Sequence, residues 1–284
     1  MESTLKPDEI TLVLAQQALV KHRMRYDLVF FKAVLAGLML SFGALMNEIV
    51  SSGTPALSAV TGNPAITKIL GGFVFPSGFV LIPMLGLELL TSNMMVFPIG
   101  IASGDIPWWS LPVNWLIVTF GNLAGSLFSA AILVHFSGIL SSEPYITGIQ
   151  SFATKKAVDP LWYQIFLRGI GCNILVCLAI WFFVGSKDTI SKIVAVWIPI
   201  WIFVASGFDH VIANMFYIPL GIMFHTESLT VGLYIRKSLI ATYLGNIVGA
   251  FIVWGPAVYF YIWNADHGAK ELEEAEVGLV KEDD

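Results

Sequence analysis

The sequence predicts an all-α polytopic membrane protein, and three observations support this fold class. Hydrophobic residues make up 56% of the 284-residue chain and charged residues only 12%, against roughly 45–50% and about 25% in soluble chains. No Asp, Glu, Lys or Arg occurs over residues 106–142 or 238–265, and each stretch exceeds the roughly 20 residues that a helix needs to cross a bilayer. A net charge of −5 without a basic block excludes a nucleic-acid-binding protein.

Six membrane spans are expected, at residues 28–49, 70–98, 109–139, 161–186, 190–222 and 238–263. They form a transmembrane domain over residues 28–263. Residues 1–27 lack the apolar core of a signal peptide and are predicted to form an amphipathic helix on the cytoplasmic membrane surface. Residues 264–284 carry eight carboxylates and two lysines, which predicts a solvated cytoplasmic tail. Lys and Arg number eight on the side that would hold both termini and five on the other, which favours cytoplasmic termini.

Two of these spans carry polar residues near their middle. The second contains Glu88, Thr91 and Asn93 together with prolines, and the fifth contains Asp209 and His210, again with prolines. Charged groups at the bilayer centre are costly unless they are paired or face a cavity. We therefore expect both spans to be broken helices whose interruptions face protein or a pore.

The two abnormal spans also resemble each other. ELLTSNMMVFP (88–98) and DHVIANMFYIP (209–219) share the pattern [DE]-x4-N-M-x3-P, and GNLAG (121–125) is matched by GNIVG (245–249). Such GxxxG motifs allow close helix approach in lipid. The chain is thus predicted to contain two three-span repeats, at about 28–139 and 161–263. Since three is odd, the second repeat is inverted, which places a permeation site where the interruptions meet.

Several segments resemble the formate/nitrite transporter family, and their amino-acid sequences are most similar to those of fungal nitrite transporters. They are GFVFPSG (72–78), ELLTSNMM (88–95), FGNLAG (120–125), RGIGCNILVCLA (168–179) and GFDHVIANMF (207–216). The resemblance implies an aquaporin-like fold and a homopentamer with one pore in each protomer. It also implies transport of small monovalent anions, coupled to a proton or as the neutral acid. Nitrite is the expected substrate and formate a close second, while lactate and hydrosulfide stay open.

His210 is the central candidate residue, because a pore for a weak acid needs a group that hydrogen-bonds or titrates near neutral pH. The resemblance makes it the pore histidine, with Asn173 and Thr91 as polar companions. It also implies an anion-attracting vestibule lysine at Lys156, with Lys155 as the alternative. By position, five residues match the apolar constrictions of the family: Phe75, Phe79, Leu90, Val176 and Phe203.

The remaining polar residues of the repeat are expected to be structural. Glu88 and Asp209 would repel an anion, so we expect them to pair with lysines or backbone donors within the helix packing. Lys32 and Arg168 begin apolar spans and are expected to extend to the membrane interface. Besides Glu88 and Asp209, the residues expected to be structural are asparagines at equivalent positions of the two repeats: Asn93, Asn214, Asn122 and Asn246.

Two other functions are alternatives to anion transport. A membrane enzyme would use Asp209, His210 and Glu88 as acid–base groups, but the sequence has no cofactor, metal-ligand or nucleophile motif. A channel for a neutral solute would share the fold class but would lack a vestibule lysine. The sequence therefore predicts a multi-pass plasma-membrane transporter without cofactor or metal, whose partners are nitrite or formate, a proton, the lipid bilayer and further copies of the chain.

Overall fold

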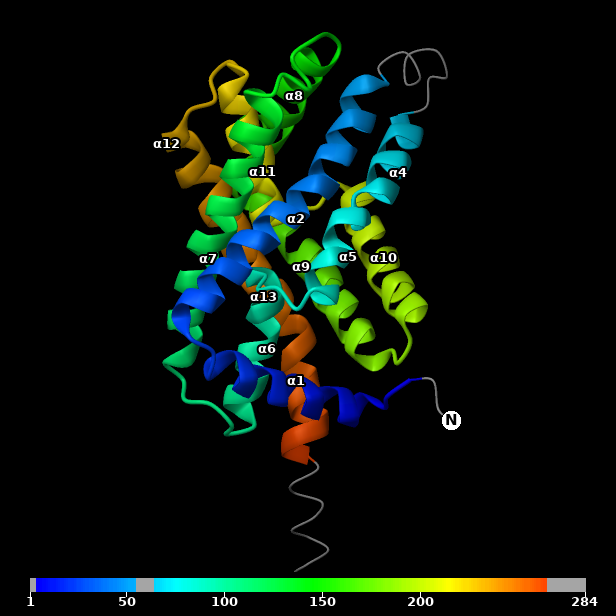
Figure 1. Ribbon diagram of the computed structural model, residues 1–284, viewed down its shortest axis with the longest axis vertical. Helices are drawn as coiled ribbons and strands as arrows, with labels where there is room; N and C mark the ends of the chain where they lie inside the picture. Colours follow the sequence, from blue (N-terminus) through cyan, green and yellow to red (C-terminus); the bar gives the residue numbers. More distant parts are fainter. Residues whose placement is uncertain (1–3, 55–63, 265–284) are drawn as a thin grey trace, which may run out of the picture.

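The computed structural model describes residues 4–54 and 64–264 and shows a helical bundle (Figure 1). Six helical spans in this part are long and apolar enough to cross a membrane, which confirms the predicted fold class. Within the described residues, β-type pairing is limited to a single bridge between Thr4 and Ser186. The predicted acidic tail, from residue 265 onward, lies outside the described residues.

The first repeat contains three spans of which the second is divided. The first span is α2 (Tyr26–Gly53). The second consists of α4 (Pro64–Val74), α5 (Pro76–Met84) and α6 (Leu90–Ala102). The third is α7 (Ser110–Phe128), which continues into the π-helix η1 (Ser129–His135).

The second repeat follows the same plan. The fourth span is α9 (Trp162–Gly185), and the divided fifth span consists of α10 (Thr189–Ser206) and α11 (Val211–Met223). The sixth is built from four consecutive helical segments: α12 (Val231–Leu233), η3 (Tyr234–Leu239), α13 (Ile240–Val258) and η4 (Tyr259–Trp263).

Both interruptions contain a glycine in the left-handed region. Gly86 has φ 64° between α5 and α6, and Gly207 has φ 81° at the end of α10. Glycine adopts this conformation without the steric penalty of a Cβ atom. The following short helices begin directly after Leu89 and His210, within the polar stretches where the sequence predicts the breaks.

The two repeats are inverted relative to each other, since α6 and α11 occupy opposite halves of the bundle (Figure 1). Within each repeat the first and third spans pack closely, α2 against α7 and α9 against α13. The GxxxG motifs make these contacts possible. A Cβ atom at Gly125 would collide with the Val34 carbonyl, and one at Gly249 would collide with the Ile170 carbonyl.

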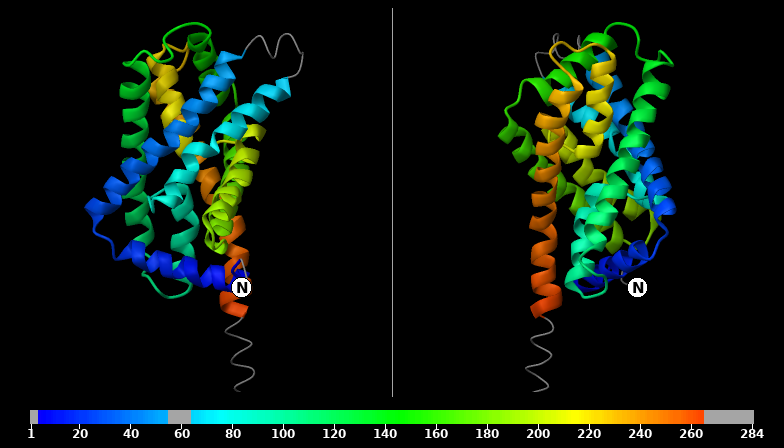
Figure 2. Two further views of the ribbon diagram at one scale, coloured as in Figure 1. Left: turned by 45° about the vertical axis from the view of Figure 1, so that its right-hand side comes forward. Right: turned by 90° about the vertical axis from the view of Figure 1, so that its left-hand side faces the viewer.

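A short helix precedes each repeat, at opposite ends of the bundle. Helix α1 (Pro7–His22) crosses the lower end, and α8 (Tyr145–Ala153) with η2 (Thr154–Val158) lies at the upper end (Figures 1 and 2). Helix α1 buries Ile10, Leu14 and Ala18, which share one face because they are four residues apart. The end of η4 lies near α1 (Figure 2), so the described part of the chain begins and ends on the same side.

Candidate functional site

The two interruptions meet in the centre of the bundle. Thr91 lies at the start of α6 and His210 directly before α11, and Thr91 Oγ1 is 2.8 Å from His210 Nε2. Both residues are buried. The structure therefore brings together two polar side chains that lie 119 positions apart in the sequence.

The hydrogen bonds of His210 define the roles of its two ring nitrogens. Nδ1 accepts from the backbone N–H of Ala213 at 3.1 Å, so His210 caps α11. An accepting Nδ1 in a neutral imidazole leaves the proton on Nε2. Nε2–H then donates to Thr91 Oγ1, and the Thr91 hydroxyl keeps its own hydrogen for another acceptor.

Asn173 lies beside this pair on α9. Its Nδ2 donates to the backbone carbonyl of Asn246 at 2.8 Å and to that of Thr91 at 3.3 Å. Its Oδ1 is buried and has no hydrogen-bond partner among the described residues. The centre therefore offers a free hydroxyl donor and a free amide acceptor within one polar group.

Two equivalent asparagines hold the starts of the short helices. Asn122 Oδ1 accepts from the Leu90 N–H, and Asn246 Oδ1 accepts from the Val211 N–H, both at 3.0 Å. The amide groups of the two asparagines also donate to the carbonyls of Glu88 and Asp209, respectively. These bonds satisfy backbone groups that the helix breaks would otherwise leave unpaired in an apolar interior.

A buried carboxylate beside each helix break is paired with a lysine from the short helix that precedes the repeat. Lys21 of α1 lies 2.7 Å from Glu88, and Lys156 of η2 lies 2.9 Å from Asp209. Both carboxylates are buried, and each accepts a further bond from an asparagine of the repeat motif: Asn93 donates to Glu88 and Asn214 donates to Asp209. The two lysines come from the two short helices at opposite ends of the bundle.

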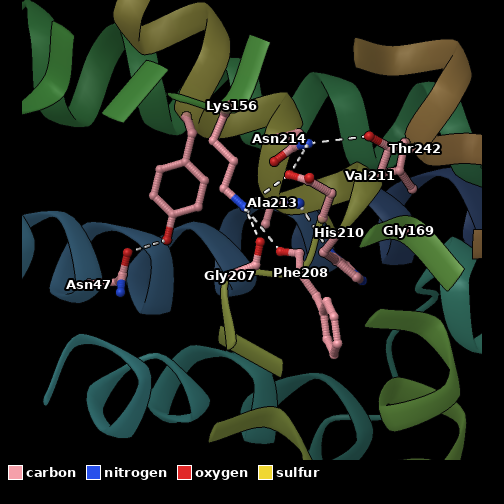
Figure 3. A network of polar contacts seen from close by, with 12 residues as sticks. Asn47, Lys156, Gly169, Gly207, Phe208, His210, Val211, Ala213, Asn214 and Thr242 are labelled. Atoms are coloured by element: carbon pink, nitrogen blue, oxygen red, sulfur yellow. Dashed lines mark hydrogen bonds and ion pairs between the residues drawn. The ribbon is translucent and has the colours of Figure 1, made fainter. Parts of the chain in front are cut away.

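A cavity of about 520 Å³ opens at the α8 end and extends to His210; we call it the α8-side cavity. Lys156 reaches into it and donates to the carbonyls of Gly207 and Phe208 as well as to Asp209 (Figure 3). Lys155 lines the same cavity but is exposed. Lys156 is therefore the lysine that contacts the loop carrying His210.

A second cavity of about 390 Å³, the α1-side cavity, lies at the other end and is partly covered by α1. Lys21 and Glu88 both line it, so Glu88 differs here from the expectation that it faces only the helix packing. Lys32 also lines this cavity and donates to the Gly86 carbonyl at 3.1 Å. It was expected to extend to the membrane interface.

All five predicted constriction residues are buried, and two of them lie close to the His210 ring. Phe75 and Phe203 line the α8-side cavity and contact each other with ring centroids 5.6 Å apart. The Phe203 and Phe79 rings lie 5.9 and 6.4 Å from the His210 ring. Leu90 and Val176 are fully buried, as is Phe79. Along α5, Phe79 lies between Phe75 of one cavity and Ile82 of the other.

The sequence pattern did not indicate the cavity positions of three cations. Lys21 was assigned to a surface helix, although the equivalence of Glu88 and Asp209 signals that each carboxylate needs a lysine from its own side. Arg168 was expected to reach the interface, but it lines the α8-side cavity, as Lys32 lines the α1-side cavity.

Cys172 and Cys177 are free and buried.

Comparison with known proteins identifies the family. A family model for formate/nitrite transporters matches residues 8–261. The chain is 36% identical over 278 residues to a probable formate transporter of Methanothermobacter thermautotrophicus, covering 93% of this chain and 99% of that one. It is 34% identical over 270 residues to the formate channel FocA of Haemophilus influenzae, covering 88% and 92%.

The fold has the same relatives. A solved structure described as a pentameric formate channel with formate bound has a TM-score of 0.71 and 30% identity, covering 81% of this chain and 95% of that chain. These similar proteins are transporters and channels, not enzymes. The chain belongs to the formate/nitrite transporter family.

Proposed function

We propose that this protein carries small planar monovalent anions, formate and nitrite, across the plasma membrane together with a proton. One observation carries the proposal: the buried Thr91–His210 pair lies between two cavities at opposite ends of the bundle. Both anions fit the available hydrogen-bonding groups. The names of several relatives favour formate, whereas the resemblance of the sequence segments to fungal nitrite transporters favours nitrite.

The central polar group suits the neutral acid better than the bare anion. The Thr91 hydroxyl can donate to one oxygen of the substrate, and the free Asn173 Oδ1 can accept from the acidic O–H of its protonated form. His210 contributes by donating Nε2–H to Thr91, which polarises the hydroxyl. Since Nδ1 is occupied by the Ala213 N–H, protonation there would break the cap of α11. We therefore propose that water, not His210, supplies the proton.

The apolar residues near the centre would select for the neutral form. Phe75 and Phe203 line the α8-side cavity, and Phe79, Leu90 and Val176 are buried inside the bundle. Moving an unpaired charge through an apolar constriction is costly, whereas the free-energy cost for a neutral acid is far lower. An anion that gains a proton in the cavity can therefore cross where the bare anion cannot.

Lys156 and Lys21 would stabilise the chain beside the α8-side cavity and the α1-side cavity, respectively. Each places a positive charge beside an interruption and holds the adjoining chain through its buried carboxylate partner. The pentameric relative suggests a homopentamer with one such path in each protomer. The positive-inside bias of the sequence favours a cytoplasmic position for the α1 end.

The proposal is tested by substrate flux in liposomes containing the purified full chain. Formate, nitrite, lactate and nitrate are each supplied at pH 5.5 and pH 7.5, and internal pH is recorded with the anion flux. We expect formate and nitrite to enter with a proton, faster at the lower pH. Nitrate should enter poorly, because it is the anion of a strong acid and stays unprotonated at both pH values. Equal flux of neutral solutes, or anion flux without internal acidification, would contradict the proposal.

A further inference from the structure

The α8-side cavity carries more positive charge than its carboxylates balance. Four cationic side chains line it: Lys68, Lys155, Lys156 and Arg168. Among the described residues that line it, Asp159 is the only carboxylate. Asp209 lies behind the cavity wall and is paired with Lys156. A cavity with an excess of one charge sign concentrates ligands of the opposite charge.

Lys156 is already engaged by the protein. An ammonium group has three N–H donors, and those of Lys156 are directed to the Gly207 carbonyl, the Phe208 carbonyl and Asp209, at 3.4, 3.0 and 2.9 Å. The Asp209 carboxylate also neutralises its charge locally. Lys156 therefore positions the loop before His210 and has no free donor for an arriving anion.

Arg168 is in the opposite situation. Its guanidinium forms no hydrogen bond or ion pair with any residue that the structure describes, although its side chain is half-buried in the cavity wall. Gln164 lines the same cavity one helical turn earlier, so both lie on one face of α9. The backbone places Arg168 beside the central loop, since its carbonyl accepts from the Asp209 N–H at 3.3 Å.

The chemistry of the guanidinium fits the proposed substrates. Formate and nitrite each carry two oxygens on one central atom, and a guanidinium presents two parallel N–H groups that bind such a pair in a bidentate manner. Lys155 and Lys68 are exposed and can contribute a long-range field. Arg168 is held on a long helix, next to the loop that leads to His210.

We propose that Arg168 forms an anion-capture site of the α8-side cavity, binding the two oxygens of a small planar anion before it reaches the Thr91–His210 centre. This site rests on the proposed function for its ligand. It assigns direct contact with the arriving anion to Arg168 and loop positioning to Lys156. Capture in the charged form precedes protonation and passage between Phe75 and Phe203.

The test measures binding and uptake separately on the full chain. Binding of ¹³C-formate to the purified protein is followed by NMR line broadening, and uptake is measured in expressing cells as external formate is increased. The variants are Arg168→Gln, which removes the charge, and Arg168→Lys, which keeps the charge but removes the fork. Arg236→Gln is the matched control, because Arg236 is an exposed arginine of η3 that does not line either cavity.

We expect Arg168→Gln to weaken formate binding and raise the half-saturating concentration by about fivefold, the scale of a partly solvated ion pair. The maximal rate should change little. The effect should shrink at high salt, Arg168→Lys should be intermediate, and Arg236→Gln should match the unmodified protein. If Arg168→Gln does not assemble, Arg168→Lys decides: binding equal to that of the unmodified protein overturns the guanidinium site.

The two proposals fail differently. Formate binding that depends on Arg168, without uptake above that of control cells, would leave the capture site standing and reject the transport function. Uptake and binding that both stay within twofold after Arg168→Gln would reject the capture site and leave the transport function standing.

Discussion

Thr91 Oγ1 lies 2.8 Å from His210 Nε2, and this contact joins the starts of two short helices from opposite repeats. His210 Nδ1 is at the same time the acceptor that caps α11. The imidazole is thus held from both sides in one tautomer. This arrangement predicts that His210 acts in transport as a fixed hydrogen-bond donor.

The first prediction concerns His210→Asn. Asparagine keeps a hydrogen-bonding side chain but cannot titrate. We expect formate flux to fall by about two- to tenfold, the effect of one weakened hydrogen bond, while its dependence on pH keeps the same shape. Flux measured in liposomes from pH 5 to pH 8 tests this. Loss of the pH dependence would show instead that His210 supplies the proton.

His210→Phe is the companion variant. Its ring has a similar volume but cannot donate to Thr91 or accept from Ala213. We expect assembly with almost no flux of any anion. Unchanged flux in a normally assembled variant would show that His210 only fills space.

A second prediction separates the two neighbouring lysines. Lys156→Ala removes the partner of Asp209, whose side chain is fully buried, and an unpaired buried charge costs about 3–5 kcal/mol. We expect lower flux and lower thermal stability, and a larger loss of both with Lys156→Glu. Lys155→Ala is the control, since Lys155 is exposed. Normal transport by Lys156→Ala together with a defect in Lys155→Ala would reverse the assignment.

The third prediction concerns the contact between α1 and the second span. Lys21→Met leaves the Glu88 carboxylate buried without its lysine, so the free energy of unfolding should fall by about 3–5 kcal/mol. Adding Glu88→Gln should recover most of this loss, because the neutral amide can still accept from Asn93. Thermal unfolding of the detergent-solubilised protein measures both variants. A double variant no more stable than Lys21→Met would contradict a direct pairing effect.

The sequence was sufficient to predict the spans and both helix breaks. Charge-free stretches marked two of the membrane segments, and the shared pattern around Asn93 and Asn214 indicated which two spans are interrupted. These features are local, because a single polar residue in an apolar span already conflicts with lipid. Pro98 and Pro219 lie inside α6 and α11, so prolines within the motif did not mark the helix breaks themselves.

The side-chain partners could not be predicted in the same way. Lys21 and Glu88 are 67 positions apart, and α1 is short enough to be compatible with a surface position. Arg168 begins an apolar span, where extension to the interface and lining of a cavity have the same sequence pattern. Only the packing of α9 against the loop after α10 distinguishes these two possibilities.

The last prediction tests the equivalence of the two repeats through Asn246. Its amide accepts from the Val211 N–H and donates to the carbonyls of Gly169 and Asp209. Asn246→Ala leaves these backbone groups without partners in the membrane interior, and at about 1 kcal/mol for each bond the free energy of unfolding should fall by about 2–3 kcal/mol. Asn122→Ala should cause a similar loss, because Asn122 makes the matching bonds to Leu90, Ala33 and Glu88. Asn264→Ala is the control, since Asn264 is exposed at the end of η4. Thermal unfolding of the three variants decides the matter: a loss at only one of the two buried asparagines would mean that the starts of α6 and α11 are held by different means.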